Sequence, residues 1–367
     1  MIPSPGLQAY GWSDALQRQF QPHAARGLIP GRVVVQQRGL YRLATDQGEL
    51  SAEVSGRFVH EAGEAGFPVA GDWAACAARP QEGAATIHAL LPRSSLFVRK
   101  ASGPGQAAQA VAANVDVALL VASLNADLNP RRLERYLAVA WESGAQPVVV
   151  LTKADACPDV EAAVARIEAV AVGVEVHAVS AVTGQGLEGV AALLAPGRTA
   201  VLLGSSGVGK STLVNALAGT ELMAVGEIRQ DDERGRHTTT HRELIRLPSG
   251  ALMLDTPGMR ELGLWDAEAG LAATFADVER EIEALSAQCR YRNCGHRKEP
   301  GCAVREAVED GRLDEGRWKS WVKLQRELAH LDRREDPVAA QAHRKHWIGI
   351  SKANRAEMRR RNREQEG

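Results

Sequence analysis

Three short motifs occur in this chain in an order that limits the folds it can adopt. TKAD at residues 152–155 precedes GSSGVGKST at residues 204–212, and DTPG at residues 255–258 comes last. In most proteins that carry these three motifs, the motif that corresponds to TKAD comes after the other two. The order therefore predicts a circularly permuted sheet, and it places whatever follows Gly258 next to the final motif.

The second motif fits GxxxxGK[ST], with an apolar strand pattern before it at 199–203 and a helical pattern after it at 213–217. Glycines let backbone N–H groups close around phosphate oxygens, and a helix N-terminus adds its positive end. We expect Lys210 to reach the β- and γ-phosphates and Ser211 to ligate Mg²⁺. The alternative is a glycine-rich turn that binds no phosphate. The candidate nucleotide contacts are Gly204, Ser205, Ser206, Gly207, Val208, Gly209, Lys210, Ser211 and Thr212.

DTPG follows an apolar stretch at 251–254, which predicts a strand that ends at Asp255. A carboxylate at that sheet edge can hold a water molecule on Mg²⁺, and the backbone N–H of Gly258 can face the γ-phosphate. Alone, four such residues also fit an ordinary strand-to-turn transition. The spacing after the phosphate motif favours the nucleotide interpretation.

TKAD favours guanine over adenine. Asp155 can accept hydrogen bonds from N1–H and the exocyclic amino group of guanine, and Lys153 can lie over the base. The usual motif begins with Asn, so Thr152 keeps a hydroxyl but loses an amide donor, and weaker base binding is one expected consequence. A following SA pair supports guanine. The candidate base contacts are Thr152, Lys153, Ala154, Asp155, Ser180 and Ala181.

Composition excludes several classes of protein. The chain has 367 residues, a net charge of −1 and a pI near 6.8, which argues against a globally basic nucleic-acid binder. It has no basic-then-apolar leader and no run of 18 apolar residues, so we expect a cytoplasmic protein without a membrane span. Five cysteines without a secretory signal argue against a disulfide framework.

The pattern along the chain predicts four segments. Residues 1–30 are expected to be a partly ordered tail, and residues 31–103 a small β-barrel of short strands that ends in a Gly/Pro linker at 102–105. Residues 104–268 alternate strand and helix, which predicts an α/β fold with a parallel sheet and helices on both faces. Residues 269–367 are expected to form a helical C-terminal domain.

Cys289, Cys294, His296 and Cys302 form a second constellation, C-x4-C-x-H-x5-C, within a polar loop. Such a loop cannot bury a core, so a metal is expected to hold it together. Three thiolates and one imidazole match a closed, tetrahedral, structural Zn²⁺ site. Unrelated thiols beside a surface histidine are the alternative.

Together these features resemble the RsgA family of small ribosomal subunit-dependent GTPases. The resemblance rests on the permuted motif order, GRHTTT at 235–240, RELGLW at 260–265 after DTPG, and the Cys-His spacing. Residues 68–73 and 93–99 also resemble the first domain of that family. The resemblance implies an OB-fold before the GTPase domain, a zinc domain after it, and a role in late maturation of the small ribosomal subunit.

The catalytic machinery is less defined. Met259 follows the glycine of DTPG where Ras-like enzymes have a water-orienting Gln, so slow intrinsic hydrolysis is expected. The resemblance implies a catalytic role for His237, and a solvent-facing loop histidine is the other interpretation. One of Thr238, Thr239 and Thr240 is expected to offer a hydroxyl to Mg²⁺. Thr239 is the candidate, with Thr238 and Thr240 as the alternatives.

The indications of RNA binding come from single segments of the sequence rather than from the overall charge. Residues 341–367 hold eight Lys/Arg against three Glu, which suits phosphate contacts but is also typical of a solvated face. The barrel aromatics Tyr41, Phe58 and Trp73 can stack on bases or fill a core.

We therefore expect a monomeric GTPase that binds GTP, GDP, the small ribosomal subunit and its rRNA. One alternative is a nucleotide-regulated rRNA-binding scaffold in which hydrolysis is incidental. An ATP-using P-loop enzyme is a third possibility, and Asp155 argues against it.

Overall fold

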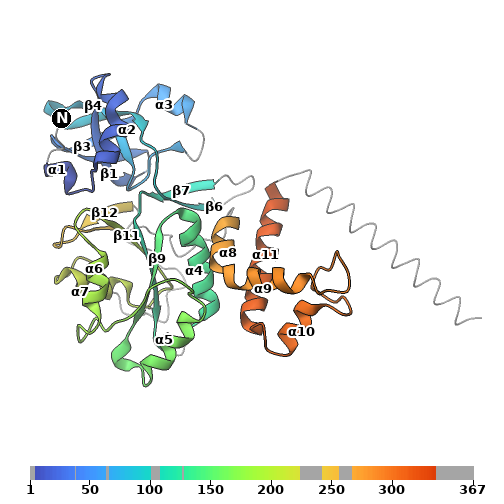
Figure 1. The fold of residues 1–367 in the computed structure, drawn as a ribbon. Coiled ribbons are helices and arrows are strands. Elements are labelled where there is room, and N and C mark those ends of the chain that lie inside the picture. Colours follow the sequence, from blue (N-terminus) through green and yellow to red (C-terminus); the bar gives the residue numbers. More distant parts are fainter. Residues whose placement is uncertain are drawn as a thin grey trace, which may run out of the picture.

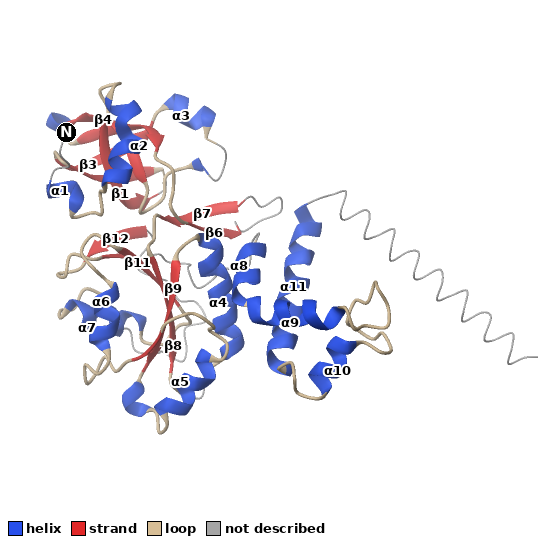
Figure 2. Cartoon of the chain, in the orientation of Figure 1, coloured by secondary structure: helices blue, strands red, loops and turns tan. Residues whose placement is uncertain are grey.

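The structure is a computed structural model of the chain, and it describes residues 5–37, 39–62, 66–100, 108–125, 128–223, 242–255 and 267–335. Figure 1 shows three parts along the sequence: a blue barrel, a green and yellow α/β body, and orange helices beside the body. The elements of each part are coloured by type in Figure 2.

The first part is a closed five-stranded barrel. Its strands pair in the order β1–β2–β3–β5–β4, and β4 pairs back onto β1. Side chains that alternate along the strands fill the interior, among them Val33, Leu43, Leu50 and Ile87. The predicted barrel is confirmed. Its strands are β1 (Ile29–Gln37), β2 (Leu40–Thr45), β3 (Gly48–Val54), β4 (Trp73–Arg79) and β5 (Ala84–Leu90).

The connections of the barrel contain the helix α3 (Gly56–Glu61) and the 3-10 helix η2 (Pro80–Glu82). Strand β3 ends because the Ser55 hydroxyl caps α3, accepting a hydrogen bond from the backbone N–H of Phe58 at 3.1 Å. Phe58 is buried, as are Tyr41 and Trp73. These three aromatic rings fill the core and present no open face for a base.

The expectation of a partly ordered N-terminal tail is wrong for the described residues from Pro5 onward. Helices α1 (Pro5–Gln8) and α2 (Asp14–Ala24) cover one side of the barrel, as Figure 1 shows. Trp12 stacks edge-on against Trp73 with ring centroids 4.8 Å apart, and Phe20 is buried beside them. The short helices have little periodic apolar pattern, so tertiary packing rather than intrinsic propensity forms them.

Two further strands, β6 (Leu96–Lys100) and β7 (Ala108–Ala113), form a separate antiparallel hairpin. Lys100 pairs with Ala108 at its end. The expected linker at 102–105 lies outside the described residues, but its flanking residues are strand partners. The described residues thus show the hairpin pairing on either side of this segment, and the linker stays a prediction.

The α/β body confirms the predicted alternation. Strands β10, β9, β8, β11 and β13 are parallel neighbours in that order, and β12 pairs antiparallel with β13. The strands are β8 (Val117–Ser123), β9 (Gln146–Thr152), β10 (Val176–Ala178), β11 (Thr199–Leu203), β12 (Arg242–Arg246) and β13 (Leu252–Asp255). The helices are α4 (Pro130–Ser143), η3 (Ala154–Ala156), α5 (Val160–Glu168), α6 (Leu187–Leu193) and α7 (Lys210–Ala218).

Helices cover both faces of this sheet. Along β8, Leu120 belongs to the core shared with α4 and α5, whereas Leu119 belongs to the core shared with α6 and α7. Side chains of a strand alternate between faces, so a strand buried on both sides is apolar throughout. This explains the continuous apolar runs that the sequence showed.

The barrel and the body share one hydrogen-bonded sheet. Strand β1 of the barrel pairs antiparallel with β12 of the body, with Val35 opposite Glu243 and Gln36 opposite Arg242. Arg32 adds a buried link, because its guanidinium donates to the Thr199 hydroxyl at 3.0 Å. The two parts are therefore joined by backbone pairing as well as by side chains.

The C-terminal part consists of α8 (Glu268–Thr274), α9 (Ala276–Ser286), α10 (Ala303–Glu309) and α11 (Glu315–Glu335). Leu324 and Leu328 of α11 are buried, and Trp318 stacks on Trp321. The apolar side of α11 therefore serves packing. Among the described helices, none combines the length and the apolar character that a membrane crossing needs.

Candidate functional site

The phosphate loop lies where sequence analysis placed it, between β11 and α7. Gly204 passes so close to β8 that a Cβ atom there would lie 2.3 Å from the Val121 carbonyl oxygen. Gly207 and Gly209 have φ of 76° and 90°, a left-handed conformation that favours glycine. The Lys210 ammonium donates to the carbonyl oxygen of Gly204 at 2.7 Å. The backbone of this loop therefore requires glycine at these three positions, which is typical of a phosphate-binding loop.

The TKAD motif is attached directly to this loop. Thr152 ends β9, and its hydroxyl lies 2.6 Å from the Val208 carbonyl oxygen and 3.3 Å from that of Ala122. Lys153 has a left-handed φ of 62°, and its ammonium donates to the Gly207 carbonyl oxygen at 3.0 Å. Two consecutive residues of the base motif therefore bind two consecutive carbonyl groups of the phosphate loop.

The remaining base-motif residues gather around the ends of β9 and β10. Asp155 is exposed in η3, and the backbone N–H of Ala154 donates to Val179 at 3.1 Å. Ser180 is buried, with its hydroxyl accepting from the backbone N–H of Thr183 at 3.1 Å. Ala181 follows it in the same loop. The two motifs that sequence analysis assigned to one base site are therefore neighbours in space.

Asp255 is the last residue of β13, which runs parallel to β11. Because parallel strands end at the same sheet edge, its backbone lies at the edge that carries the phosphate loop. Five other candidates lie outside the described residues: His237, Thr238, Thr239, Thr240 and Gly258. Met259 and the basic residues of 341–367 lie outside them as well.

One contact to the phosphate loop was not predicted from the sequence. Arg132, in the first turn of α4, donates from Nη1 to the Ser205 hydroxyl at 2.8 Å. The Asn129 side chain caps this turn, accepting from the backbone N–H of Arg131 at 3.1 Å. The available signal was Asn129 followed by proline after a buried strand, which predicts a helix that starts at the ligand-binding edge of the sheet.

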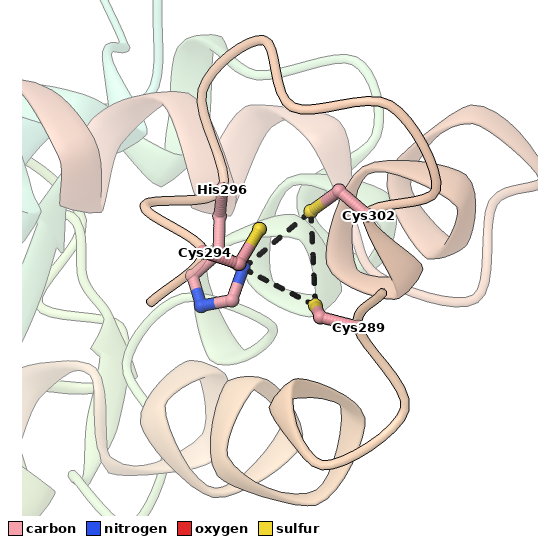
Figure 3. Close-up of side chains that lie close together, drawn as sticks. All are labelled: Cys289, Cys294, His296 and Cys302. Atoms are coloured by element: carbon pink, nitrogen blue, oxygen red, sulfur yellow. Dashed lines mark hydrogen bonds between the residues drawn. The ribbon is translucent and has the colours of Figure 1, made fainter. Parts of the chain in front are cut away.

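Cys289, Cys294, His296 and Cys302 converge on one point, as Figure 3 shows. Their ligand atoms all lie within 4.8 Å of one another. The Nδ1 atom of His296 is 3.6 Å from the Cys289 sulfur and 3.4 Å from the Cys302 sulfur, and the two sulfurs are 4.0 Å apart. Ligands about 2.3 Å from a tetrahedral zinc are about 3.7 Å from one another. The cluster therefore fits a structural zinc ion.

Neighbouring groups hold this cluster in place. The Ser286 hydroxyl lies 3.1 Å from Nε2 of His296, which turns Nδ1 toward the thiols. Burial opposes ionisation of Cys289, yet hydrogen bonds from the backbone of Ala303 and Val304 leave its pKa lowered overall. A thiol that ionises more readily is a better metal ligand.

A carboxylate organises the loop between these ligands. Glu299 accepts from the backbone N–H of Gly295 at 3.0 Å, of Arg297 at 2.7 Å and of Lys298 at 2.9 Å. Hydrogen bonds from its own backbone, Arg297 and Lys298 lower the pKa of Glu299 to about 2. The ionised carboxylate thus satisfies three backbone donors in a loop that has no regular secondary structure.

Comparison with known proteins decides the family. A family model described as RsgA GTPase matches residues 90–265. A small ribosomal subunit biogenesis GTPase RsgA from Opitutus terrae is 46% identical over 363 residues, covering 96% of this chain and 98% of its own length. The chain belongs to the RsgA GTPase family. An RsgA from Syntrophotalea carbinolica is 44% identical over 332 residues, covering 88% of this chain and 90% of its own length.

Solved structures agree with the RsgA assignment. The crystal structure of YjeQ from Thermotoga maritima aligns with a TM-score of 0.58 and 25% identity, covering 82% of this chain and 98% of that one. YloQ, described as a circularly permuted GTPase, aligns with a TM-score of 0.55 and 25% identity, covering 82% and 95%. The permuted fold and the resemblance to RsgA that the motifs predicted are confirmed.

Proposed function

We propose that this RsgA family member hydrolyses GTP while it acts on the small ribosomal subunit during late maturation, and that the subunit stimulates turnover and release. The observation that carries the proposal is the pair of contacts from Thr152 and Lys153 to the phosphate loop. They join a base-reading motif and a phosphate-binding motif into one site. The relatives named above add the ribosomal context.

Within this site each residue has a proposed role. Asp155 selects guanine, because its carboxylate can accept from the two N–H groups that guanine presents together. Lys210 binds the β- and γ-phosphates, and Ser211 and Thr239 ligate Mg²⁺, with Asp255 contacting it through water. His237 positions the attacking water, since Met259 has no group that can do so. Gly258 senses the γ-phosphate.

Zinc is proposed as a resident structural ion held by Cys289, Cys294, His296 and Cys302. Three thiolates and an imidazole fill a tetrahedral coordination shell and leave no open position, so the ion would supply stability rather than catalysis. Magnesium is proposed to arrive with the nucleotide. When bound, it neutralises charge on the phosphates during transfer.

The partner surface is proposed to be ribosomal RNA. Four cationic side chains of the Cys-His loop are exposed: Arg290, Arg292, Arg297 and Lys298. Together with the basic segment at 341–367 they suit phosphate neutralisation, which predicts salt-sensitive binding. We propose that the protein acts as a cytoplasmic monomer, with an N-terminal segment at 1–30, a barrel at 31–103, a GTPase domain at 104–268 and a zinc domain at 269–367.

A release assay separates the GTPase function from an rRNA-binding scaffold. Purified small subunits are loaded with the protein and GTP, and dissociation is followed after sedimentation. His237→Ala should remain on the subunit longer than wild type, and a nonhydrolysable GTP analogue should hold wild type in place. Release of His237→Ala at the wild-type rate would favour the scaffold. Competition by ATP at concentrations near those of GTP would favour the ATP-using alternative.

A further inference from the structure

Helix α4 contacts the phosphate loop at its first turn and the C-terminal helices over its remaining length. At the first turn, the Arg132 guanidinium donates to the Ser205 hydroxyl at 2.8 Å. In Figure 1 the helix lies between the sheet of the body and α8. It is thus a rigid element that touches both the nucleotide site and the module that carries the Cys-His cluster.

Two residues beyond Arg132, α4 is bound to α11 by a buried ion pair. Glu134 is 1% exposed and lies 2.9 Å from Arg317, and it also accepts from the Ser320 hydroxyl. The same guanidinium reaches Asp277 of α9 and the Thr274 carbonyl oxygen of α8. A single charged group therefore joins α4 to three C-terminal helices. Its removal would leave Glu134 buried and unpaired, which is strongly destabilising.

A second ion pair lies nearer the surface. Arg135 binds Glu327 of α11 in a two-pronged contact, with both N–O distances 2.6 Å. The side chain of Glu327 is 34% exposed, so changing it leaves no charge stranded in the core. Arg135 and Arg132 are three residues apart on the same helix. Residues three apart are neighbours on a helix surface, so the contacts to Glu327 and to Ser205 start from adjacent positions of α4.

The packing along α4 is uneven. Toward the C-terminal end of α4, helix α8 packs closely against it. A Cβ atom on Gly270 of α8 would lie 2.0 Å from the Ala138 carbonyl oxygen of α4. Near the N-terminal end of α4, a cleft lies between α4, α5 and the C-terminal helices, and the Glu134–Arg317 pair forms part of its wall. The residues of α4, and the one before it, that line this cleft are Asn129, Pro130, Arg131 and Glu134. The C-terminal helices are therefore held to α4 by close backbone packing at one end and by the Glu134–Arg317 pair beside the cleft at the other.

We propose that Arg132 is a positioning residue for the phosphate loop and that α4 transmits the state of the C-terminal module to it through Arg132 and Ser205. The inference rests on the proposed function, for which it supplies a path of regulation. Movement of α11 shifts α4 through Glu134 and Arg135, and the Arg132 turn moves with it. Because coupling between sites is reciprocal, the nucleotide bound at the loop shifts the arrangement of the C-terminal helices by the same coupling free energy.

The first test needs no ribosomal particles. Hydrogen exchange of the α11 amides is measured in the full-length protein saturated with GDP or with a nonhydrolysable GTP analogue. Wild type should show different exchange in the two states, and Arg132→Lys should remove the difference while both nucleotides stay bound. Arg131→Lys, the neighbouring arginine that lines the cleft, is the matched control and should keep it. Identical α11 exchange in both states of wild type would overturn the proposal.

The second test uses purified small subunits. Glu327→Gln should keep its unstimulated GTP turnover and lose about 2- to 30-fold of the stimulation. Glu315→Gln is the control, because Glu315 pairs with Lys319 on α11 itself. Adding Glu327→Gln to Arg132→Lys should cause little further loss, whereas independent losses that multiply would contradict a shared path. If subunits fail to stimulate wild type, the proposed function fails, and the exchange experiment still tests the path.

Discussion

The hydroxyl of Thr152 lies 2.6 Å from the carbonyl oxygen of Val208, so the strand that carries the base motif is bound directly to the phosphate loop. A hydroxyl has one hydrogen atom, whereas the amide of the usual Asn has two. When Thr152 donates to the loop, it has no further hydrogen for the base. In this chain the first residue of the motif therefore supports the loop, and we assign base recognition to Asp155.

Thr152→Val should weaken GTP and GDP binding to a similar extent. The two side chains have nearly the same shape, but valine leaves the Val208 carbonyl without its donor. Loss of such a hydrogen bond costs about 1 kcal/mol, which is roughly fivefold in affinity. Titration with a fluorescent GDP analogue measures the change. Thr152→Ser, which keeps the hydroxyl, should bind nearly as wild type does. An equal loss in both variants would mean that packing, not the hydrogen bond, matters.

Asp155→Asn should lower GTP affinity by about 100-fold, because the carboxylate accepts two hydrogen bonds that the amide cannot match. Xanthosine triphosphate presents a carbonyl in place of the exocyclic amino group, so it should bind the variant better than GTP does. Competition assays with both nucleotides measure whether the variant prefers xanthosine triphosphate to GTP. Unchanged preference for GTP would remove Asp155 from the base site.

The sequence predicted the strands that end at these motifs because each strand is a buried apolar run. Strand 199–203 was predicted with its observed bounds. The glycines within 204–209 predicted a loop whose backbone leaves no room for a side chain at the glycine positions. The Cys-His spacing predicted a cluster that the structure assembles. In all three cases the information is local in sequence, within about 15 residues.

Other features depend on contacts between distant segments. Trp12 and Phe20 gave no clear helical period, and only their packing against Trp73 reveals an ordered N-terminal segment. The pairing of Gln36 with Arg242 spans the whole body and has no local signal. Arg132 belongs to an ordinary amphipathic helix, and its contact with Ser205 depends on the placement of α4 at the sheet edge.

Cys294→Ser should abolish zinc retention and loosen the loop 287–302. A serine hydroxyl is a poor zinc ligand, and the remaining three ligands leave the coordination shell open. Metal content after gel filtration, together with limited proteolysis of the C-terminal module, measures both effects. Cys157→Ser is the control because Cys157 lies apart from the cluster. Full zinc content in Cys294→Ser would contradict the assigned ligand set.

Glu299 predicts a pH dependence of the same loop. Its folded pKa is depressed to about 2 from an ordinary value of 4.5, so the ionised carboxylate stabilises the fold above about pH 4.5. That contribution is lost as pH falls from 4.5 toward 2. The difference in thermal midpoint between wild type and Glu299→Gln should be constant from pH 5 to 7 and should shrink below 4.5. A difference that grows on acidification would contradict the assigned hydrogen bonds.

Gly270→Ala should destabilise the contact between α8 and α4 by about 1–3 kcal/mol, because the added methyl group meets the Ala138 carbonyl oxygen. Thermal or denaturant unfolding measures the loss. Gly316→Ala is the matched control in α11, where a Cβ atom would meet only the end of the Asp314 side chain at 3.1 Å. Equal stability of the two variants would show that α8 is not closely packed on α4.

GTP turnover of the full-length protein, measured with and without purified small ribosomal subunits, tests whether the protein is a GTPase that the subunit stimulates. We expect slow turnover of the protein alone, a large increase at saturating small subunits, and no comparable increase with large subunits. Turnover that is the same in all three conditions would contradict this expectation.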